Sequence, residues 1–113
     1  MKQLEEKVFI WAKERGIFDN ATPIKQLEKT KEEVDELSEA LIAQNNNLST
    51  YINSKGKIVN TSEEIIDGIG DIFVTLLIQC RFQEIDILDC LNSAYNEISN
   101  RTGEMVDGKF VKD

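Results

Sequence analysis

The sequence predicts an all-α protein that resembles a four-helix bundle and ends in a short C-terminal tail or hairpin. Apolar residues recur at helical spacing in four segments of the chain. The 113 residues include only one proline and six glycines, and 41% are apolar and 30% charged, which is typical of a compact helical protein. A chain of this length builds one core, so we expect residues 1–113 to form a single domain.

The first two helices are predicted from their ends. Helical spacing of apolar residues begins with Leu4, Val8, Trp11 and Ala12. Gly16 can end this first helix. Thr22 and Pro23 predict the second start, because threonine caps a helix and proline suits its first position. This helix should reach about Ala43. Its apolar stripe, which we expect to face the core, comprises Leu27, Thr30, Val34, Leu37 and Leu41.

A polar connection over residues 44–60, with a Lys-Gly-Lys turn, precedes the third helix. Thr61 is predicted to cap this helix, with Glu64 reaching back to complete a capping box. The helix runs to Cys80 and is apolar on most sides after Asp71, so its second half should be the most buried element of the chain.

The fourth helix is expected from about Asp86 to Asn100. Its predicted inward face comprises Leu88, Leu91, Ala94, Tyr95 and Ile98. Gly103 lies where a helix C-cap is expected. Asp107 and Gly108 lie between short apolar pairs, a pattern that favours a small hairpin.

Charge and cysteine content limit the function. The net charge of −8 disfavours binding to nucleic acid or to an anionic membrane. Cys80 and Cys90 are too few to hold a fold together and indicate reduced thiols in a cytoplasmic protein. The N-terminus is charged throughout and does not resemble a signal peptide. The longest apolar run, residues 72–78, is too short to span a bilayer.

Acidic residues crowd the second helix. Its outer face should carry Glu28, Asp35 and Glu39 as ordinary solvated charges. A strip beside the apolar stripe, which packing should half-bury, comprises Gln26, Lys29, Glu33 and Glu36. Half-buried carboxylates repel one another unless a cation lies between them. Such a run is also typical of a solvated helix face.

The third helix supplies facing carboxylates. Asp67 and Asp71 lie one turn apart, beside Gly68 and Gly70, which are poor helix formers and suggest close approach of a ligand or of another helix. Four carboxylates from two adjacent helices would form an all-oxygen site suited to Mg²⁺ or Mn²⁺. A di-iron bundle uses Glu-x-x-His pairs, and this chain has no histidine.

These segments resemble the MazG-like nucleoside triphosphate pyrophosphohydrolases, which are all-α enzymes. "QLEKTKEEVDELSEAL" is similar to the first acidic block of the family, with the pair Glu33 and Glu36 preceded by Lys29. "IIDGIGDIFVTLL" is similar to the second block, and "FIWAKERGI" and "AYNEISNRTGEMVDGKFVKD" extend the resemblance over nearly the whole chain. The sequence departs from the family where a glutamate is usual, because Gly68 stands there. Asp67 replaces it as in phage-type members, and the register Glu64-x-x-Asp67 is an alternative.

The resemblance implies hydrolysis of nucleoside triphosphates between the α and β phosphates, which yields a monophosphate and pyrophosphate. Its metal ligands would be Glu33, Glu36, Asp67 and Asp71, holding Mg²⁺ or Mn²⁺. Glu33 or Glu36 would also orient the attacking water or accept its proton.

The sequence also suggests substrate-binding residues and an oligomeric state. Lys29 and Arg101 are candidates for neutralising phosphate oxygens, although Arg101 suits a surface ion pair equally well. Gln26 and Asn96 are candidates for sugar or base contacts, and Trp11 for base stacking, although its spacing also suits a core position. The resemblance and the apolar third helix both imply a homo-oligomer, a dimer or tetramer. The alternative is a non-catalytic acidic helical module that binds a basic protein.

Overall fold

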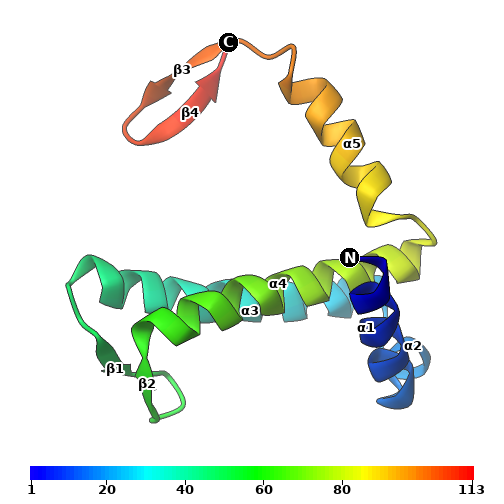
Figure 1. Ribbon diagram of the computed structural model, residues 1–113, viewed down its shortest axis with the longest axis horizontal. Helices are drawn as coiled ribbons and strands as arrows, with labels where there is room; N and C mark the ends of the chain where they lie inside the picture. The colour runs from blue at the N-terminus through cyan, green and yellow to red at the C-terminus, as the bar shows by residue number, and fades with distance from the viewer.

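Two long antiparallel helices form the body of the molecule. The computed structural model describes residues 1–113, and in it α3 (Pro23–Asn45) and α4 (Thr61–Gln83) lie side by side (Figure 1). Their direction follows from contacts at both ends: the Gln79 side chain donates to the Pro23 carbonyl at 2.9 Å, and Gly68 faces Leu37. Thr22 accepts a hydrogen bond from the Lys25 N–H at 3.2 Å, which confirms the predicted cap of α3.

Two short helices lie across one end of this pair. As predicted, α1 (Lys2–Glu14) ends before Gly16, which adopts φ 75°. The chain then forms one further turn of helix, α2 (Ile17–Asn20), which the sequence pattern did not predict. This turn is held against α4 by an edge-to-face contact between the rings of Phe18 and Phe82, whose centroids lie 5.2 Å apart.

The connection between α3 and α4 contains a hairpin. Strands β1 (Thr50–Ile52) and β2 (Ile58–Asn60) pair antiparallel, with Tyr51 opposite Val59. Three-residue strands are too short to show the alternation that identifies a strand in a sequence, so this hairpin was not predicted. The predicted cap of the next helix is also wrong, because Asn60 caps α4 by accepting from the Glu63 N–H, while Thr61 donates to the Leu48 carbonyl.

The C-terminal quarter of the chain, which follows α4, stands away from the body (Figure 1). Asp86 caps α5 (Ile87–Ile98) and accepts a hydrogen bond from the Leu88 N–H at 2.8 Å. Strands β3 (Gly103–Val106) and β4 (Lys109–Lys112) form the predicted hairpin, with Asp107 and Gly108 both at positive φ in its turn. Gly103 begins a strand, so its predicted role as a helix cap is wrong. The predicted inward face of α5 is exposed, with Leu91 64% exposed.

Only part of the predicted apolar stripe of α3 packs on α4, through Thr30 and Leu37. The buried residues of α3 are Gln26, Thr30, Glu33, Ala40 and Ala43. Of the stripe only Thr30 is buried, whereas Val34 is 47% exposed. Leu37 lies against Gly68, and Gln26 and Thr30 form hydrogen bonds with Thr75, so α3 packs on α4 along the border between the predicted stripe and the polar strip. The second half of α4 is buried as predicted, through Thr75, Leu77, Ile78 and Cys80.

The chain is helical as predicted but is not an all-α four-helix bundle, because it has five helices and two hairpins. No large side chain is fully buried, and α4 exposes Ile66 by 71%. A single copy therefore leaves much apolar surface of α3, α4 and α5 uncovered. None of the helices combines the length and the apolar character that a bilayer crossing requires.

Candidate functional site

Residues from α1, α2, α3 and α4 line a hollow of about 210 Å³. It is lined by Trp11, Ile17, Gln26, Lys29, Glu33, Asp71, Val74, Thr75 and Ile78. Five of the predicted site residues therefore meet in one place, although they come from three helices: Trp11, Gln26, Lys29, Glu33 and Asp71.

Glu33 is the most buried acid of this group. Only 8% of the residue is exposed, and its Oε1 atom lies 3.3 Å from Lys29 Nζ. Its Oε2 atom is buried and has no hydrogen-bond partner. Burial raises the pKa of Glu33; the Lys29 ammonium opposes this shift, and the neighbouring Glu36 carboxylate reinforces it. A buried carboxylate oxygen without a partner destabilises the fold, so a cation at this position would relieve a real cost.

Asp71 brings α4 into the same site. Although the residue as a whole is exposed, its carboxylate borders the hollow, and partial desolvation raises its pKa. Repulsion from Asp67 and Glu36 adds to the shift, while Lys29 lowers it. Glu36 thus lies close enough to influence both Glu33 and Asp71, and Asp67 influences Asp71, but only Glu33 and Asp71 border the hollow.

Lys29 is the cation of the site. Its Nζ atom lies 3.3 Å from both Glu32 and Glu33. Burial lowers the pKa of Lys29, but hydrogen bonds and the charges of these two carboxylates outweigh burial and leave the pKa above its ordinary value. Lys29 is therefore charged at neutral pH and stands at the edge of the hollow, where an anionic group of a ligand would meet it.

Gln26 and Trp11 differ in how accessible their side chains are to a ligand. The Gln26 side-chain nitrogen donates to the Thr75 carbonyl at 3.2 Å, which ties this amide to α4 and leaves its oxygen and its second N–H for a ligand. Trp11 is 45% exposed, so it is not a core residue, and the Arg15 guanidinium lies 5.5 Å from the centre of its ring. Its flat ring forms an accessible wall of the hollow.

The structure does not bring Asn96 and Arg101 to this hollow. Asn96 lies on α5 and Arg101 follows it, in the part of the chain that stands away from α3 and α4 (Figure 1). Arg101 forms an ion pair with Glu97 at 3.9 Å, and the Asn96 carbonyl accepts from Ser99 and Asn100. Within one copy these two residues are surface groups.

The tip of the hairpin β1–β2 contacts Glu36 and Glu39 of α3. Here Lys55 Nζ lies 3.4 Å from Glu36 Oε1, and Ser54 donates two hydrogen bonds to Glu39. The prediction that Glu39 is an ordinary solvated charge is therefore wrong. Glu64 does not close a capping box; it borders a hollow of about 220 Å³ beneath the hairpin, together with Tyr51. Burial raises the pKa of Tyr51, and Glu64, Glu39 and Glu36 add to this shift. No sequence pattern indicated these contacts, because they depend on the hairpin.

The acid cluster is not a preassembled metal centre, since no group of three or more Asp, Glu or Cys side chains lies in position to hold an ion. Two observations nevertheless fit a hard cation. The available donors are all carboxylate oxygens, and one of them, Glu33 Oε2, is buried without a partner. Glu36 is occupied by Lys55, so binding a cation there would require this ion pair to open.

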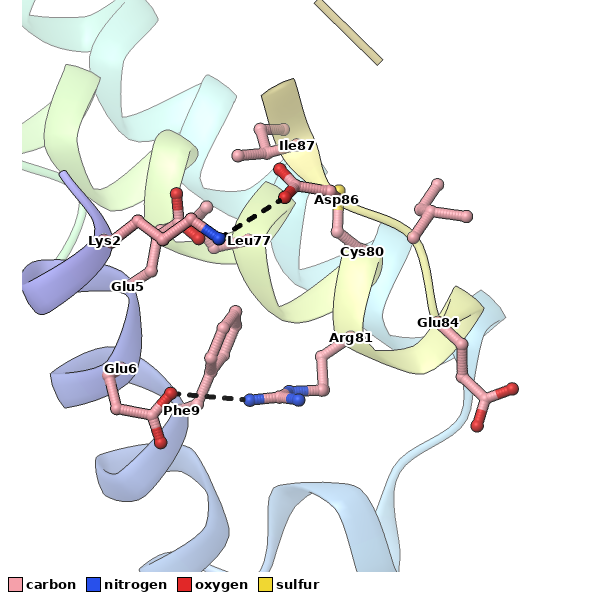
Figure 2. A pocket seen from close by; sticks show the side chains of 11 residues that line it. Lys2, Glu5, Glu6, Phe9, Leu77, Cys80, Arg81, Glu84, Asp86 and Ile87 are labelled. Atoms are coloured by element: carbon pink, nitrogen blue, oxygen red, sulfur yellow. Dashed lines mark ion pairs between the residues drawn. The ribbon is translucent and has the colours of Figure 1, made fainter. Parts of the chain in front are cut away.

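A larger hollow of about 550 Å³ lies where α1, α4 and the start of α5 meet (Figure 2). Its charges pair within it: Lys2 with Asp86 and Arg81 with Glu6, both at 3.9 Å. Glu5 is buried here with one oxygen lacking a partner. None of the predicted site residues lies in this hollow.

Comparisons with known proteins give no match: no family model, no characterised protein and no solved structure is significantly similar to this chain. The resemblance to MazG-like enzymes therefore depends on the quoted motifs alone.

Proposed function

We propose that this protein is a MazG-like pyrophosphohydrolase that hydrolyses nucleoside triphosphates between the α and β phosphates in the presence of Mg²⁺. One observation carries the proposal: Lys29, Glu33 and Asp71, from two facing helices, share a hollow with an exposed tryptophan ring. The two acidic blocks that resemble the family thus meet at one place, and that place has a cationic side and an aromatic wall.

The cation would be held by carboxylates from both helices, Glu33 and Glu36 of α3 and Asp67 and Asp71 of α4, and Mn²⁺ suits the same donors. When bound, it would offset the carboxylate charge and act as a Lewis acid toward the phosphoryl oxygens. The proposed substrate requires such a cation, because a chain of net charge −8 repels a triphosphate.

The side chains of the hollow suit distinct tasks. Glu33, which borders the hollow, would be the base that orients water and accepts its proton, with Glu36 as the alternative on the same helix. Lys29 would neutralise a phosphate oxygen. Trp11 would stack on the base, and the Gln26 oxygen, which is not used by Thr75, would accept a hydrogen bond from the sugar or base.

The same proposal includes a homo-oligomer, a dimer or a tetramer. It is supported by the exposed apolar residues of α3, α4 and α5, which a second copy would cover. Asn96 and Arg101 would then bind substrate only if α5 of one copy reaches the hollow of another. The two free cysteines fit a cytoplasmic protein.

The test is product analysis with a panel of nucleoside triphosphates. Monophosphate and pyrophosphate should form with Mg²⁺ and not in EDTA. Asp71→Asn should reduce the rate more than about a hundredfold while the helical circular dichroism is unchanged, because the amide keeps the shape and loses the charge. Asp35→Asn, at an exposed position of α3, should keep full activity.

Other outcomes would contradict the proposal. Diphosphate with inorganic phosphate as products, or equal rates in EDTA, would exclude the mechanism. The absence of turnover together with binding to a basic protein would favour the non-catalytic interaction module.

A further inference from the structure

The tip of hairpin β1–β2 carries two lysines to the edge of the acid cluster. Lys55 Nζ lies 3.4 Å from Glu36 Oε1, and Lys57 borders the same hollow of about 220 Å³. Both lysines are exposed. Apart from Lys29, which already faces two carboxylates, these are the basic groups that the fold places beside the predicted metal ligands.

The position of the tip is fixed from two sides. Within the turn, the Asn53 side chain accepts from the backbone N–H groups of Lys55 and Lys57, both at 3.0 Å, and Gly56 adopts φ 80°. Toward α3, the Glu39 carboxylate accepts from the Ser54 N–H at 2.8 Å and from the Ser54 hydroxyl at 3.2 Å. A charge-assisted contact to two donors holds the turn on α3 rather than leaving it free in solvent.

We propose that Lys55 and Lys57 bind the β and γ phosphates of the substrate, and that Glu39 is the positioning residue that holds them there. The inference rests on the proposed function, because the substrate class is the one that the acid cluster indicates. Lys55 forms an ion pair with Glu36. Once a divalent cation takes over Glu36, the Lys55 ammonium is free for a phosphate oxygen a few ångströms from that carboxylate.

This arrangement gives the site a preference for polyphosphate tails. A nucleoside monophosphate has no β and γ phosphates and would gain nothing from the hairpin tip. A triphosphate would meet both ammonium groups, and pyrophosphate, as the leaving group, would be released from them after the cut. The hairpin would thus separate substrate from the monophosphate product by charge.

The binding test uses calorimetry on the full-length protein. With Mg²⁺ present, Lys55→Ala and Lys57→Ala should each weaken binding of inorganic tripolyphosphate by about tenfold, which is the usual size of one lost charged hydrogen bond. Titrated with Mg²⁺ alone, Lys55→Ala should bind about two- to fivefold more tightly, because the competing ammonium is gone. Lys31→Ala, an exposed lysine of α3, is the matched control and should change neither affinity. A surface ion pair without a role in binding would not produce these opposite changes.

The positioning role has its own test. Glu39→Ala should raise KM for a triphosphate by at least as much as Lys55→Ala, with kcat changed less, and adding Lys55→Ala to Glu39→Ala should raise KM no further. Glu39→Gln, whose amide oxygen can still accept from Ser54, should recover part of the loss. Additive effects of the two alanine variants would show that Glu39 does not act through Lys55.

The two proposals fail separately. If the wild-type protein releases pyrophosphate and both lysine variants bind tripolyphosphate normally, the hairpin inference is wrong and the proposed function stands. If the wild type releases none but the lysine variants lose tripolyphosphate binding, the hairpin site stands and the enzyme assignment falls. If tripolyphosphate binds neither the wild type nor the variants, the hairpin inference is wrong, and product analysis alone decides the proposed function.

Discussion

Glu33→Gln tests whether the crowded acids form a cation site or only a surface. In EDTA the variant removes the charge from a carboxylate that is 8% exposed and whose Oε2 atom has no partner. An unsatisfied buried polar group costs about 1–3 kcal/mol, and the amide, which is uncharged, should recover about 1 kcal/mol of this. Relief of repulsion with Glu36, one turn away, adds about 0.3 kcal/mol.

Loss of the ion pair to Lys29 acts in the opposite direction. It costs at most about 1 kcal/mol, because Lys29 is half exposed and keeps Glu32 at 3.3 Å. The net gain should be about 0.5 kcal/mol, and since 1 kcal/mol shifts the Tm of a domain of this size by roughly 4 °C, we expect the Tm in EDTA to rise by about 2 °C.

Mg²⁺ should reverse the order of the two proteins. A ligand at a hundred times its Kd stabilises the folded state by about 2.7 kcal/mol, so the wild type should gain roughly 10 °C and Glu33→Gln much less. Differential scanning fluorimetry with and without Mg²⁺ measures both effects. Asp35→Asn on the same helix is the control and should show neither. If Glu33→Gln and Asp35→Asn behave alike in both conditions, the cation-site interpretation of Glu33 is refuted.

Three further predictions address pH, packing and assembly. The pKa of Asp71 is raised in the folded state, so its protonated form stabilises the fold at low pH and this contribution is lost as pH rises. The Tm advantage of Asp71→Asn over the wild type in EDTA should therefore grow between about pH 4 and pH 7. A Tm difference that stays constant over this range would contradict the prediction. Gly70→Ala adds a Cβ in open space and should raise the free energy of unfolding by up to about 1 kcal/mol, whereas Gly68→Ala should gain little, because its Cβ would lie 3.2 Å from Leu37 Cδ1; equal denaturant midpoints would refute this difference. Light scattering at micromolar concentration should report a dimer or tetramer that Ile69→Glu dissociates, and a monomeric wild type would exclude the proposed assembly.

Helix ends were predicted well where a local signal determines them. One or two adjacent residues determine three of these features, so the sequence alone predicts them. They are the cap of α3 at Thr22 and Pro23, the end of α1 before Gly16, and the C-terminal turn at Asp107 and Gly108. The Asn60 cap of α4 was missed because Thr61 offers an equally good local signal. Thr61 is instead bound to the Leu48 carbonyl, a contact that exists only after the hairpin has formed.

The face of α3 that packs was predicted less well, for a different reason. Periodicity identifies the apolar stripe of a helix but does not show which neighbour covers it. Here α4 meets α3 through Thr30 and Leu37 at one edge of the stripe, and it buries Gln26 and Glu33 of the neighbouring polar strip while Val34 stays exposed. The prediction that Glu33 is desolvated was right in direction, and its burial is deeper than the half-buried position expected from the sequence.

The orientation of α3 leaves two features of the chain unsatisfied, a buried carboxylate oxygen and an exposed apolar surface. A helix that buries Gln26, Thr30 and Glu33 while exposing Leu27 and Val34 is unfavourable for an isolated chain in water. The side chains of Gln26 and Thr30 both form hydrogen bonds with Thr75, but Glu33 Oε2 is left without a partner. A cation would satisfy Glu33, and a second copy would cover the exposed apolar residues that lie beside it on the same helix. Because both would act on α3, a substitution that weakens assembly should also lower the Mg²⁺ affinity of the acid cluster, and the concentration dependence of Mg²⁺ binding measures that coupling.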